Sequence, residues 1–213
     1  MSDVVNEIYD CILDMDDELI CEKVQEALDE GISPQEILEK GMVSAMDEIG
    51  RQYEAGDFFI PEMLVCAETM KAGMEILRPH LTKAGVEPAG KIVAGTVKGD
   101  LHDIGKSLLC MMLEGAAFEI IDLGSDVDET KFIEAVKEFK PDFLAMSAML
   151  TTTRENMKTV IDLLEEAGLR DQVKVLVGGA PVNQDFAEKI GADGYATDAA
   201  DAVRVAKNLL GIE

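Results

Sequence analysis

Residues 92–106, IVAGTVKGDLHDIGK, contain the transition that decides the fold. An unbroken apolar run over residues 92–97 leads into a polar loop, and a helical pattern begins at Ile104. A short, continuously apolar run followed by a loop and a helix is typical of a strand buried on both faces of a parallel sheet. The stretch therefore predicts a strand–loop–helix unit.

The rest of the chain beyond residue 90 repeats this unit. Further apolar runs lie at 118–123, 143–147, 173–177 and, more weakly, 194–196, and helical patterns lie at 104–113, 130–139, 154–167, 181–190 and 199–210. Strands that alternate with helices predict a doubly wound parallel sheet covered on both faces. Five strands suit a flavodoxin-like order, 2-1-3-4-5, in which ligands bind at the carboxyl ends of the strands, where strands 1 and 3 diverge.

The first part of the chain carries helical signals and no strand signal. Apolar residues recur with helical spacing over 5–12, 20–28, 37–49 and 63–77. Ser33-Pro34 gives an N-cap and a proline at the first helical position, and Pro61 opens the last helix. Four helices with short connections predict a small bundle.

The domain boundary is expected between these two patterns. Residues 82–90 contain Gly85, Pro88 and Gly90, a composition typical of a linker. We therefore predict a helical domain at residues 1–88 and an α/β domain at residues 89–213.

The composition argues against several classes of protein. The chain has 213 residues with 43 acidic and 19 basic side chains, a formal charge of −24. Such a charge argues against binding to nucleic acid or to an anionic membrane. No apolar run is long enough to span a bilayer, and the four cysteines form no CxxC pair. We expect a cytoplasmic protein.

Polar and glycine-rich clusters follow three of the predicted strands. Strand 1 ends in Lys98-Gly99-Asp100-Leu101-His102-Asp103-Ile104-Gly105, strand 3 in Ser147-Ala148-Met149-Leu150-Thr151-Thr152-Thr153, and strand 4 in Gly178-Gly179. Because the strands are predicted to be parallel, these clusters should meet at one edge of the sheet. The three threonines also fit an N-cap for the next helix.

His102 is the residue of this edge with the clearest chemistry. A neutral imidazole binds metals, and a nearby carboxylate such as Asp100 can fix its tautomer. The sequence offers no second histidine or cysteine nearby for a zinc site, so the other metal ligands would come most naturally from a macrocycle. The alternative is a loop histidine whose hydrogen bonds are satisfied by Asp100 or Asp103, and the Asp-x-His-x-x-Gly spacing alone favours that alternative.

The combination of motifs resembles the cobalamin-binding domain family. Its elements here are Asp100-x-His102-x-x-Gly105, Ser147-x-Met149 and Gly178-Gly179, and the helical first part resembles the cap domain of the family, including Phe58-Phe59-Ile60-Pro61. The chain is most similar to the corrinoid proteins of methylotrophic methyltransferase systems and to the cobalamin-binding region of methionine synthase. Met149 stands where the family commonly has leucine, a near-isosteric difference.

The resemblance implies a role for each matching residue. His102 would be the lower axial ligand of cobalt in a base-off, His-on corrinoid, with Asp100 and Thr153 controlling its protonation. Gly105 would make room for the nucleotide tail. Phe58, Phe59 and Leu64 would cover the upper face of the cofactor. The remaining predicted cofactor-binding residues are Ser147, Met149, Thr151, Gly178 and Gly179.

The resemblance also implies a function. The chain would be a methyl carrier, a subunit that is not a complete catalyst alone. It would accept a methyl group on cobalt from a substrate:corrinoid methyltransferase and deliver it to a second methyltransferase acting on a thiol or tetrahydrofolate. A reductive activator is a further implied partner. The donor stays open among methylamines, methanol, glycine betaine and similar compounds.

Three other functions remain as alternatives. A cobalamin-dependent sensor would usually need a DNA-binding or signalling module, for which this chain has no spare segment. The small subunit of a carbon-skeleton mutase would leave the helical cap unexplained. A receiver-like regulator would use Asp100 for phosphorylation and would bind no corrinoid.

Overall fold

The structure is a computed structural model that describes residues 2–212, apart from the side chain of Glu54. Within this range the chain divides into two compact units. The first contains the residues up to Ala89 together with Glu114–Ala117, and the second contains Gly90–Leu113 and the residues from Phe118 onward. The expected domain boundary between residues 88 and 89 stays a prediction.

The first unit is built from helices. Its elements are α1 (Asp3–Leu13), α2 (Asp17–Asp29), α3 (Pro34–Glu36), η1 (Ile37–Val43), α4 (Ser44–Ala55) and α5 (Ile60–Ala84). The expected apolar stripes form its core, with Val5, Ile8 and Ile12 of α1 buried against the others. The Phe59 N–H at the start of α5 donates to Glu62 Oε2 at 2.8 Å, and Pro61 lies in the first turn.

One helix of this unit differs from the regular helix that the sequence predicts. α3, η1 and α4 follow one another without a break, and η1 is a π-helix. The Ser33 hydroxyl caps the start of α3 by accepting from the Glu36 N–H at 3.1 Å. Within η1, a Cβ on Gly41 would lie 3.1 Å from Ile8 Cγ2, so the missing side chain lets this helix approach α1 closely.

The second unit is the predicted parallel sheet. Within the described residues it has five strands, β1 (Lys91–Thr96), β2 (Glu119–Asp122), β3 (Phe143–Ser147), β4 (Lys174–Gly178) and β5 (Gly194–Ala196). Their order, β2-β1-β3-β4-β5, is the order that the sequence predicts, and each pair is parallel. The register places Thr96 beside Ser147 and Ser147 beside Gly178, so three strand ends meet at one edge.

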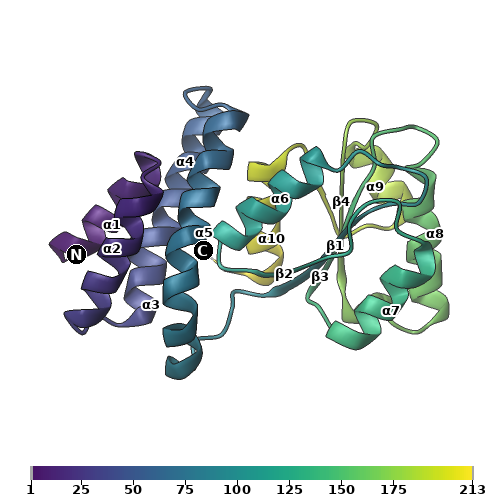
Figure 1. The fold of residues 1–213 in the computed structure, drawn as a ribbon. Helices are drawn as coiled ribbons and strands as arrows, with labels where there is room; N and C mark the ends of the chain where they lie inside the picture. Colours follow the sequence, from purple (N-terminus) through teal and green to yellow (C-terminus); the bar gives the residue numbers. More distant parts are fainter. Residues whose placement is uncertain (1, 213) are drawn as a thin grey trace. The chain divides into compact units, whose positions relative to one another are not determined.

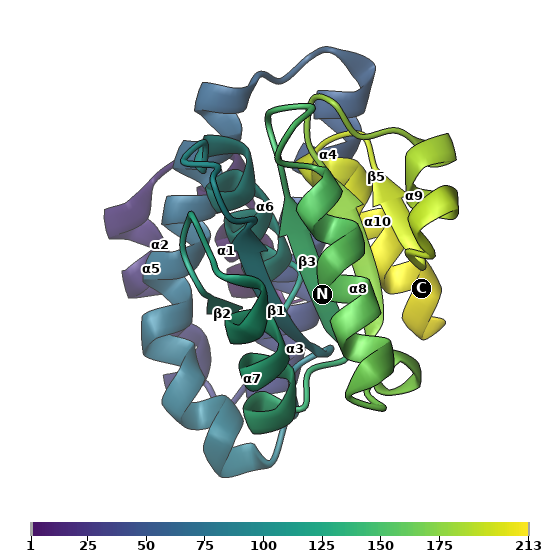
Figure 2. The same cartoon turned by 90° about the vertical axis from the view of Figure 1, so that its right-hand side faces the viewer.

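Helices cover both faces of this sheet. They are α6 (Ile104–Gly115), α7 (Glu129–Phe139), α8 (Glu155–Glu166), α9 (Gln184–Ile190) and α10 (Ala199–Leu210), with a 3-10 turn η2 (Arg170–Gln172) before β4. Figures 1 and 2 show α6 and α10 on one face and α7, α8 and α9 on the other. α9 begins three residues later than the pattern predicts because Asn183 caps it, accepting from the Phe186 N–H at 2.9 Å.

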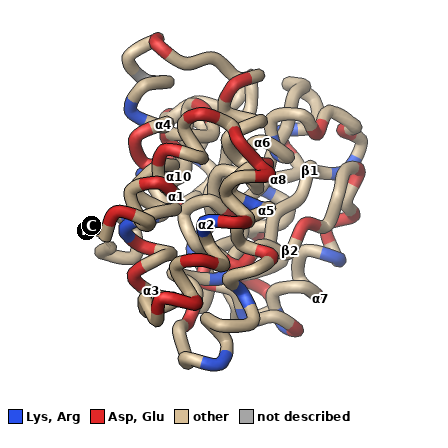
Figure 3. The backbone as a smooth tube through the Cα atoms, turned by 60° about the vertical axis from the view of Figure 1, so that its left-hand side comes forward, with Lys and Arg blue, Asp and Glu red and all other residues tan. Residues whose placement is uncertain are grey.

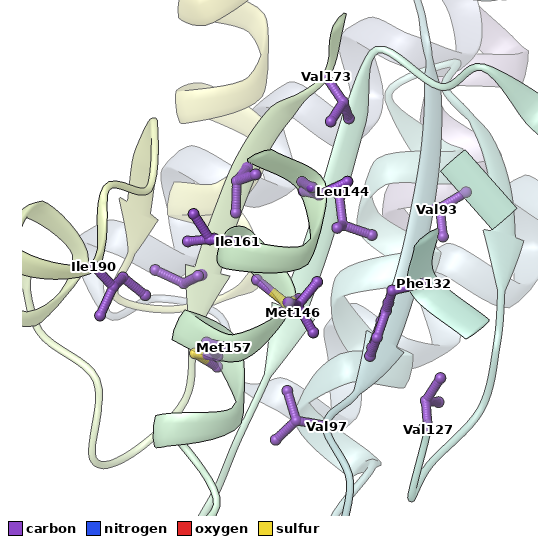
Figure 4. Packing of buried hydrophobic residues seen from close by; sticks show 14 of the residues in the cluster. Val93, Val97, Val127, Phe132, Leu144, Met146, Met157, Ile161, Val173 and Ile190 are labelled. Carbon is purple, nitrogen blue, oxygen red and sulfur yellow. The ribbon is translucent and has the colours of Figure 1, made fainter. Parts of the chain in front are cut away.

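Many charged residues lie along the helices, whereas the core on one face of the sheet is apolar. Figure 3 shows Asp and Glu along many helices, with fewer Lys and Arg. The core beneath α7, α8 and α9 is apolar, and Figure 4 shows Phe132 beside β1 and Met146, Met157 and Ile161 packed near one another. A Cβ on Gly95 would lie 2.6 Å from the Phe132 ring, which explains a glycine in the interior strand β1.

No helix within residues 2–212 combines the length and the apolar character that a membrane span requires.

Candidate functional site

The loop between β1 and α6 carries Asp100 and His102. Asp100 is fully buried, whereas the His102 side chain is 57% exposed. Asp100 Oδ1 lies 2.7 Å from His102 Nδ1 and also accepts from the His102 backbone N–H at 3.1 Å. One carboxylate oxygen therefore orients both the ring and the backbone of the histidine.

The other oxygen of Asp100 connects this loop to the loop after β3. Asp100 Oδ2 accepts from the Thr153 hydroxyl at 2.6 Å, from the Met149 N–H at 2.7 Å and from the Leu150 N–H at 3.3 Å. The fold thus brings together Asp100, His102 and Thr153, which are separated by up to 53 positions. The Thr153 side chain is directed to Asp100, and it does not cap α8, which begins after Arg154 without a side-chain cap.

These contacts fix the charge of Asp100. Burial alone raises the pKa of this carboxyl group, but the hydrogen bonds from Thr153, Met149 and His102 outweigh burial and hold its pKa far below the ordinary value. An ionised carboxylate only accepts hydrogen bonds. The hydrogen between the two side chains consequently lies on His102 Nδ1.

The tautomer of His102 follows from this assignment. A neutral imidazole with its hydrogen on Nδ1 has a lone pair on Nε2, which can bind a metal ion. Within residues 2–212, Nε2 has no hydrogen-bond partner. Over the same residues, no three His, Cys, Asp or Glu side chains are grouped to hold a metal ion. A metal at Nε2 would take its remaining ligands from outside the described chain.

Exposed apolar side chains lie in the same two loops as His102 and the donors to Asp100. Leu101 is 73% exposed and Ile104 is 80% exposed, while Met149 and Leu150 are about half exposed. The first two belong to the His102 loop and the first turn of α6, and the backbone N–H groups of the other two contact Asp100. Exposed apolar groups around one polar atom are typical of a ligand surface.

Of these four residues, Met149 alone is a cofactor-binding residue predicted from the sequence. Leu101 and Ile104 have a signal in the sequence, since Leu101 is a large apolar residue in a polar loop and Ile104 is a large apolar residue at the start of the helix that follows. Leu150 has no comparable signal, because the sequence around it would fit a side chain buried at the start of the next helix equally well.

The glycines at this edge have different surroundings. A Cβ on Gly105 would have no heavy atom within 4 Å, so Gly105 leaves open space at the start of α6. Gly179 has φ +117°, and a Cβ there would lie 1.9 Å from the Ala148 carbonyl oxygen. Gly179 is therefore required by the close approach of two chain segments, whatever it contributes to a ligand.

The other predicted residues of this edge lie at the strand ends. Ser147 ends β3 and is half-buried, Gly178 ends β4 beside it, and Thr151 is exposed in the loop that follows β3. The hydroxyl of Thr96, at the end of β1, is buried without a hydrogen-bond partner among the described residues. An unpaired buried hydroxyl is uncommon in folded proteins, because burying a polar group without a hydrogen bond costs free energy.

An ion pair with one buried partner, Lys106, was not predicted from the sequence. Lys106 of α6 is 2% exposed, and its Nζ contacts Asp122 Oδ2 at the end of β2. Asp122 Oδ1 accepts from the Gly124 N–H at 2.9 Å. Nothing local in the sequence pairs Lys106 with Asp122, because the contact depends on β2 lying next to β1.

The predicted aromatic residues belong to the helical unit. Phe59 is 64% exposed at the start of α5, and Phe58 and Leu64 are half-buried. The unit that holds His102 does not include them, so their position over a cofactor stays a prediction.

Comparison with known proteins gives one consistent family. Residues 90–204 and residues 4–78 each match a family described as "B12 binding domain". The chain is 45% identical to trimethylamine corrinoid protein 1 of Methanosarcina acetivorans over 210 residues, which cover 98% of this chain and 97% of that protein.

Two solved structures are similar over most of the chain. One is a cobalamin-binding protein from Desulfitobacterium hafniense, 34% identical with a TM-score of 0.80, covering 96% of this chain and 97% of that one. The other is the methanol:cobalamin methyltransferase complex MtaBC of Methanosarcina barkeri, in which the matched chain is 29% identical with a TM-score of 0.87, covering 99% of this chain and 80% of that one.

Proposed function

The chain belongs to the B12-binding domain family as a corrinoid protein of methylotrophic methyltransferase systems, and on this premise we propose that His102 is the lower axial ligand of its cobalt. The observation that supports this assignment most is the 2.7 Å contact between His102 Nδ1 and the ionised Asp100, which leaves the lone pair of Nε2 available. The cofactor would then be bound base-off and His-on.

Other features of the chain fit a corrinoid. The bound group would supply a cobalt centre that accepts and releases a methyl group. Leu101, Ile104 and Met149 offer an apolar surface around Nε2 for a flat macrocycle, and the open space at Gly105 suits a bulky substituent passing the start of α6. We assign the nucleotide tail to the strand ends, with Ser147, Thr151, Gly178 and Gly179 beside it.

The protein groups would hold a proton at defined atoms. Asp100 accepts the hydrogen of Nδ1, and the Thr153 hydroxyl donates to Asp100, so the imidazole keeps one tautomer. We propose that Phe58, Phe59 and Leu64 of the helical unit exclude water from the opposite face of the cofactor.

We also propose the partners. One methyltransferase would load the carrier and a second would transfer the methyl group to a thiol or to tetrahydrofolate, with a reductive activator restoring the cofactor. The similarity to trimethylamine corrinoid protein 1 favours a methylamine as the donor. We keep the cytoplasm as the proposed location, because the four cysteines of the sequence form no CxxC pair and no spacing pattern typical of secreted proteins.

Reconstitution with hydroxocobalamin tests this proposal. We expect the wild-type protein to bind the corrinoid and, after reduction, to accept a methyl group from a methylamine donor with its methyltransferase, followed by absorption spectroscopy. His102→Ala should lose the spectrum of imidazole-ligated cobalt. His80→Ala, which changes the other histidine of the chain, is the matched control and should behave as wild type. Identical spectra for both variants would overturn the assignment of His102.

A further inference from the structure

The connection between β2 and α7 holds the His102 loop from the side. We call residues 123–128 the anchoring segment. Asp126 Oδ1 accepts from the Gly99 N–H at 2.7 Å, and the Asp126 N–H donates to the Asp100 carbonyl at 2.9 Å. Asp126 therefore holds two backbone groups of the His102 loop, the N–H of Gly99 and the carbonyl of Asp100.

The backbone of Asp126 is held in an uncommon conformation. Its φ is +54°, in the left-handed region that residues other than glycine, asparagine and aspartate rarely adopt. Asp126 is exposed, so burial of its side chain does not stabilise this conformation. In this conformation Asp126 forms its two hydrogen bonds to the backbone of Gly99 and Asp100.

The neighbouring contacts hold the chain before this point. Lys98 Nζ contacts Asp128 Oδ2 at 2.8 Å, and the Lys98 carbonyl accepts from Asn156 Nδ2 at 2.8 Å. Val97 forms a parallel bridge with Val127. These contacts fix residues 97 and 98, whereas Asp126 acts on Gly99 and Asp100 themselves.

Asp100 has little freedom to move. Its Oδ1 must reach His102 Nδ1 while its Oδ2 reaches Thr153 and the Met149 N–H. Because each oxygen is held by a different loop, a shift of the Asp100 backbone would lengthen at least one set of hydrogen bonds. The position of that backbone therefore decides whether the carboxylate can hold the hydrogen of Nδ1.

We propose that Asp126 is a positioning residue that places Asp100 and thereby keeps His102 in the tautomer with its hydrogen on Nδ1 and Nε2 free. This inference rests on the proposed function only in naming Nε2 as the atom that binds cobalt. A simple turn residue would provide the left-handed conformation alone, and glycine would then replace Asp126 without loss.

Three substitutions separate the hydrogen bond from the conformation. Asp126→Asn keeps an accepting oxygen and tolerates positive φ, Asp126→Gly keeps the conformation but removes the acceptor, and Asp126→Ala removes both. If Asp126→Ala does not fold, the comparison of Asp126→Gly and Asp126→Asn with wild type is sufficient for the test.

The readout is the tautomer of His102 in the corrinoid-free protein. Long-range proton–nitrogen NMR of ¹⁵N-histidine-labelled protein, in alkaline buffer where imidazole is neutral, distinguishes the nitrogen that bears hydrogen. We expect wild type and Asp126→Asn to show hydrogen on Nδ1, and Asp126→Gly to show a mixture of both tautomers. The His80 signals serve as an internal control, since they should be unchanged in all variants.

Two outcomes would overturn the inference. One is a wild-type tautomer in Asp126→Gly, which would reduce Asp126 to a turn residue. The other is a loss in Asp126→Asn as large as in Asp126→Gly, which would contradict an accepted hydrogen bond as the cause. Circular dichroism and thermal unfolding establish that each variant compared is folded.

Corrinoid binding separates this inference from the proposed function. Titration with hydroxocobalamin should show roughly tenfold weaker binding for Asp126→Gly than for wild type, the usual effect of losing a group that orients a metal ligand. If wild type binds no corrinoid, the proposed function fails, while the NMR result still decides the role of Asp126.

Discussion

Asp100 is the residue at which the contacts of the site converge. It is fully buried, yet it remains ionised because its oxygens accept hydrogen bonds from a side-chain hydroxyl, an imidazole and three backbone N–H groups. A buried carboxylate without these donors would be costly. The arrangement uses this charge to fix the tautomer of an exposed histidine.

Thr153→Val tests the charge of Asp100 at the residue scale. The substitution keeps the side-chain shape and removes one hydrogen bond to a charged group, so we expect it to lower the free energy of unfolding near neutral pH by about 2 kcal/mol. Thr152→Val, at the exposed neighbour, is the matched control and should change this free energy by less than about 0.5 kcal/mol. Urea unfolding measures both.

The pH dependence of this difference has a defined sign. The pKa of Asp100 is lower in the folded than in the unfolded protein, so its contribution to stability is present above the ordinary carboxyl pKa and is lost as the pH falls toward the lowered value. The difference between wild type and Thr153→Val should therefore shrink in acid. A difference that stays constant with pH would mean that Thr153 acts only through packing.

Gly105→Ala tests whether the open space at the start of α6 is used by a ligand. Alanine meets no atom within 4 Å and is the better helix former, so stability should be unchanged or increased by up to about 1 kcal/mol. Corrinoid binding, measured by titration, should be weakened. Unchanged binding in a folded Gly105→Ala protein would remove Gly105 from the cofactor site.

At the scale of elements, the ion pair between Lys106 and Asp122 joins the first turn of α6 to the end of β2. The two partners differ in exposure, since the Lys106 side chain is 2% exposed and that of Asp122 is 40% exposed. The loss of Asp122 would leave a buried positive charge without a partner, whereas the loss of Lys106 would leave a carboxylate that water can reach.

The two single substitutions should thus have unequal effects. We expect Asp122→Asn to lower the free energy of unfolding by about 3 kcal/mol and Lys106→Met, which keeps the length of the side chain, by about 1 kcal/mol. Chemical unfolding of both variants gives the comparison. Equal losses would show that the pair contributes as a solvated surface contact.

The elements differ in how far the sequence could predict them. The strands and α10 follow from apolar runs and helical spacing, and five strands that alternate with helices suit the flavodoxin-like order that the sheet has. The π-helix Ile37–Val43 could not be predicted, because seven residues are too few to separate its period from that of an α-helix. The start of α9 depends on which residue caps it, a contact that the apolar pattern does not encode.

The site shows the same division. Asp100 and His102 are close in sequence, and Thr153 follows a predicted neighbouring strand, so their meeting could be predicted. Asp126 could not, because its role depends on the path of the loop after β2 and on a left-handed residue. Local motifs therefore predict which residues meet at this edge of the sheet, and tertiary contacts decide what holds those residues in place.

At the scale of the whole molecule, the charge of −24 is carried along many helices (Figure 3). Such a surface favours partners with basic docking faces and repels nucleic acid. The proposed carrier would act with the corrinoid bound. The proposed function therefore depends on the bond between His102 and cobalt.

Electron paramagnetic resonance of the loaded protein in its cobalt(II) state tests that bond most directly. The sample is compared with one grown on ¹⁵N-histidine, with His80→Ala as the control that leaves His102 as the single labelled residue. We predict that the nitrogen splitting of the cobalt signal changes from triplets to doublets on labelling, in wild type and in His80→Ala alike. A splitting unaffected by the label would mean that no histidine binds the cobalt, and it would contradict the account.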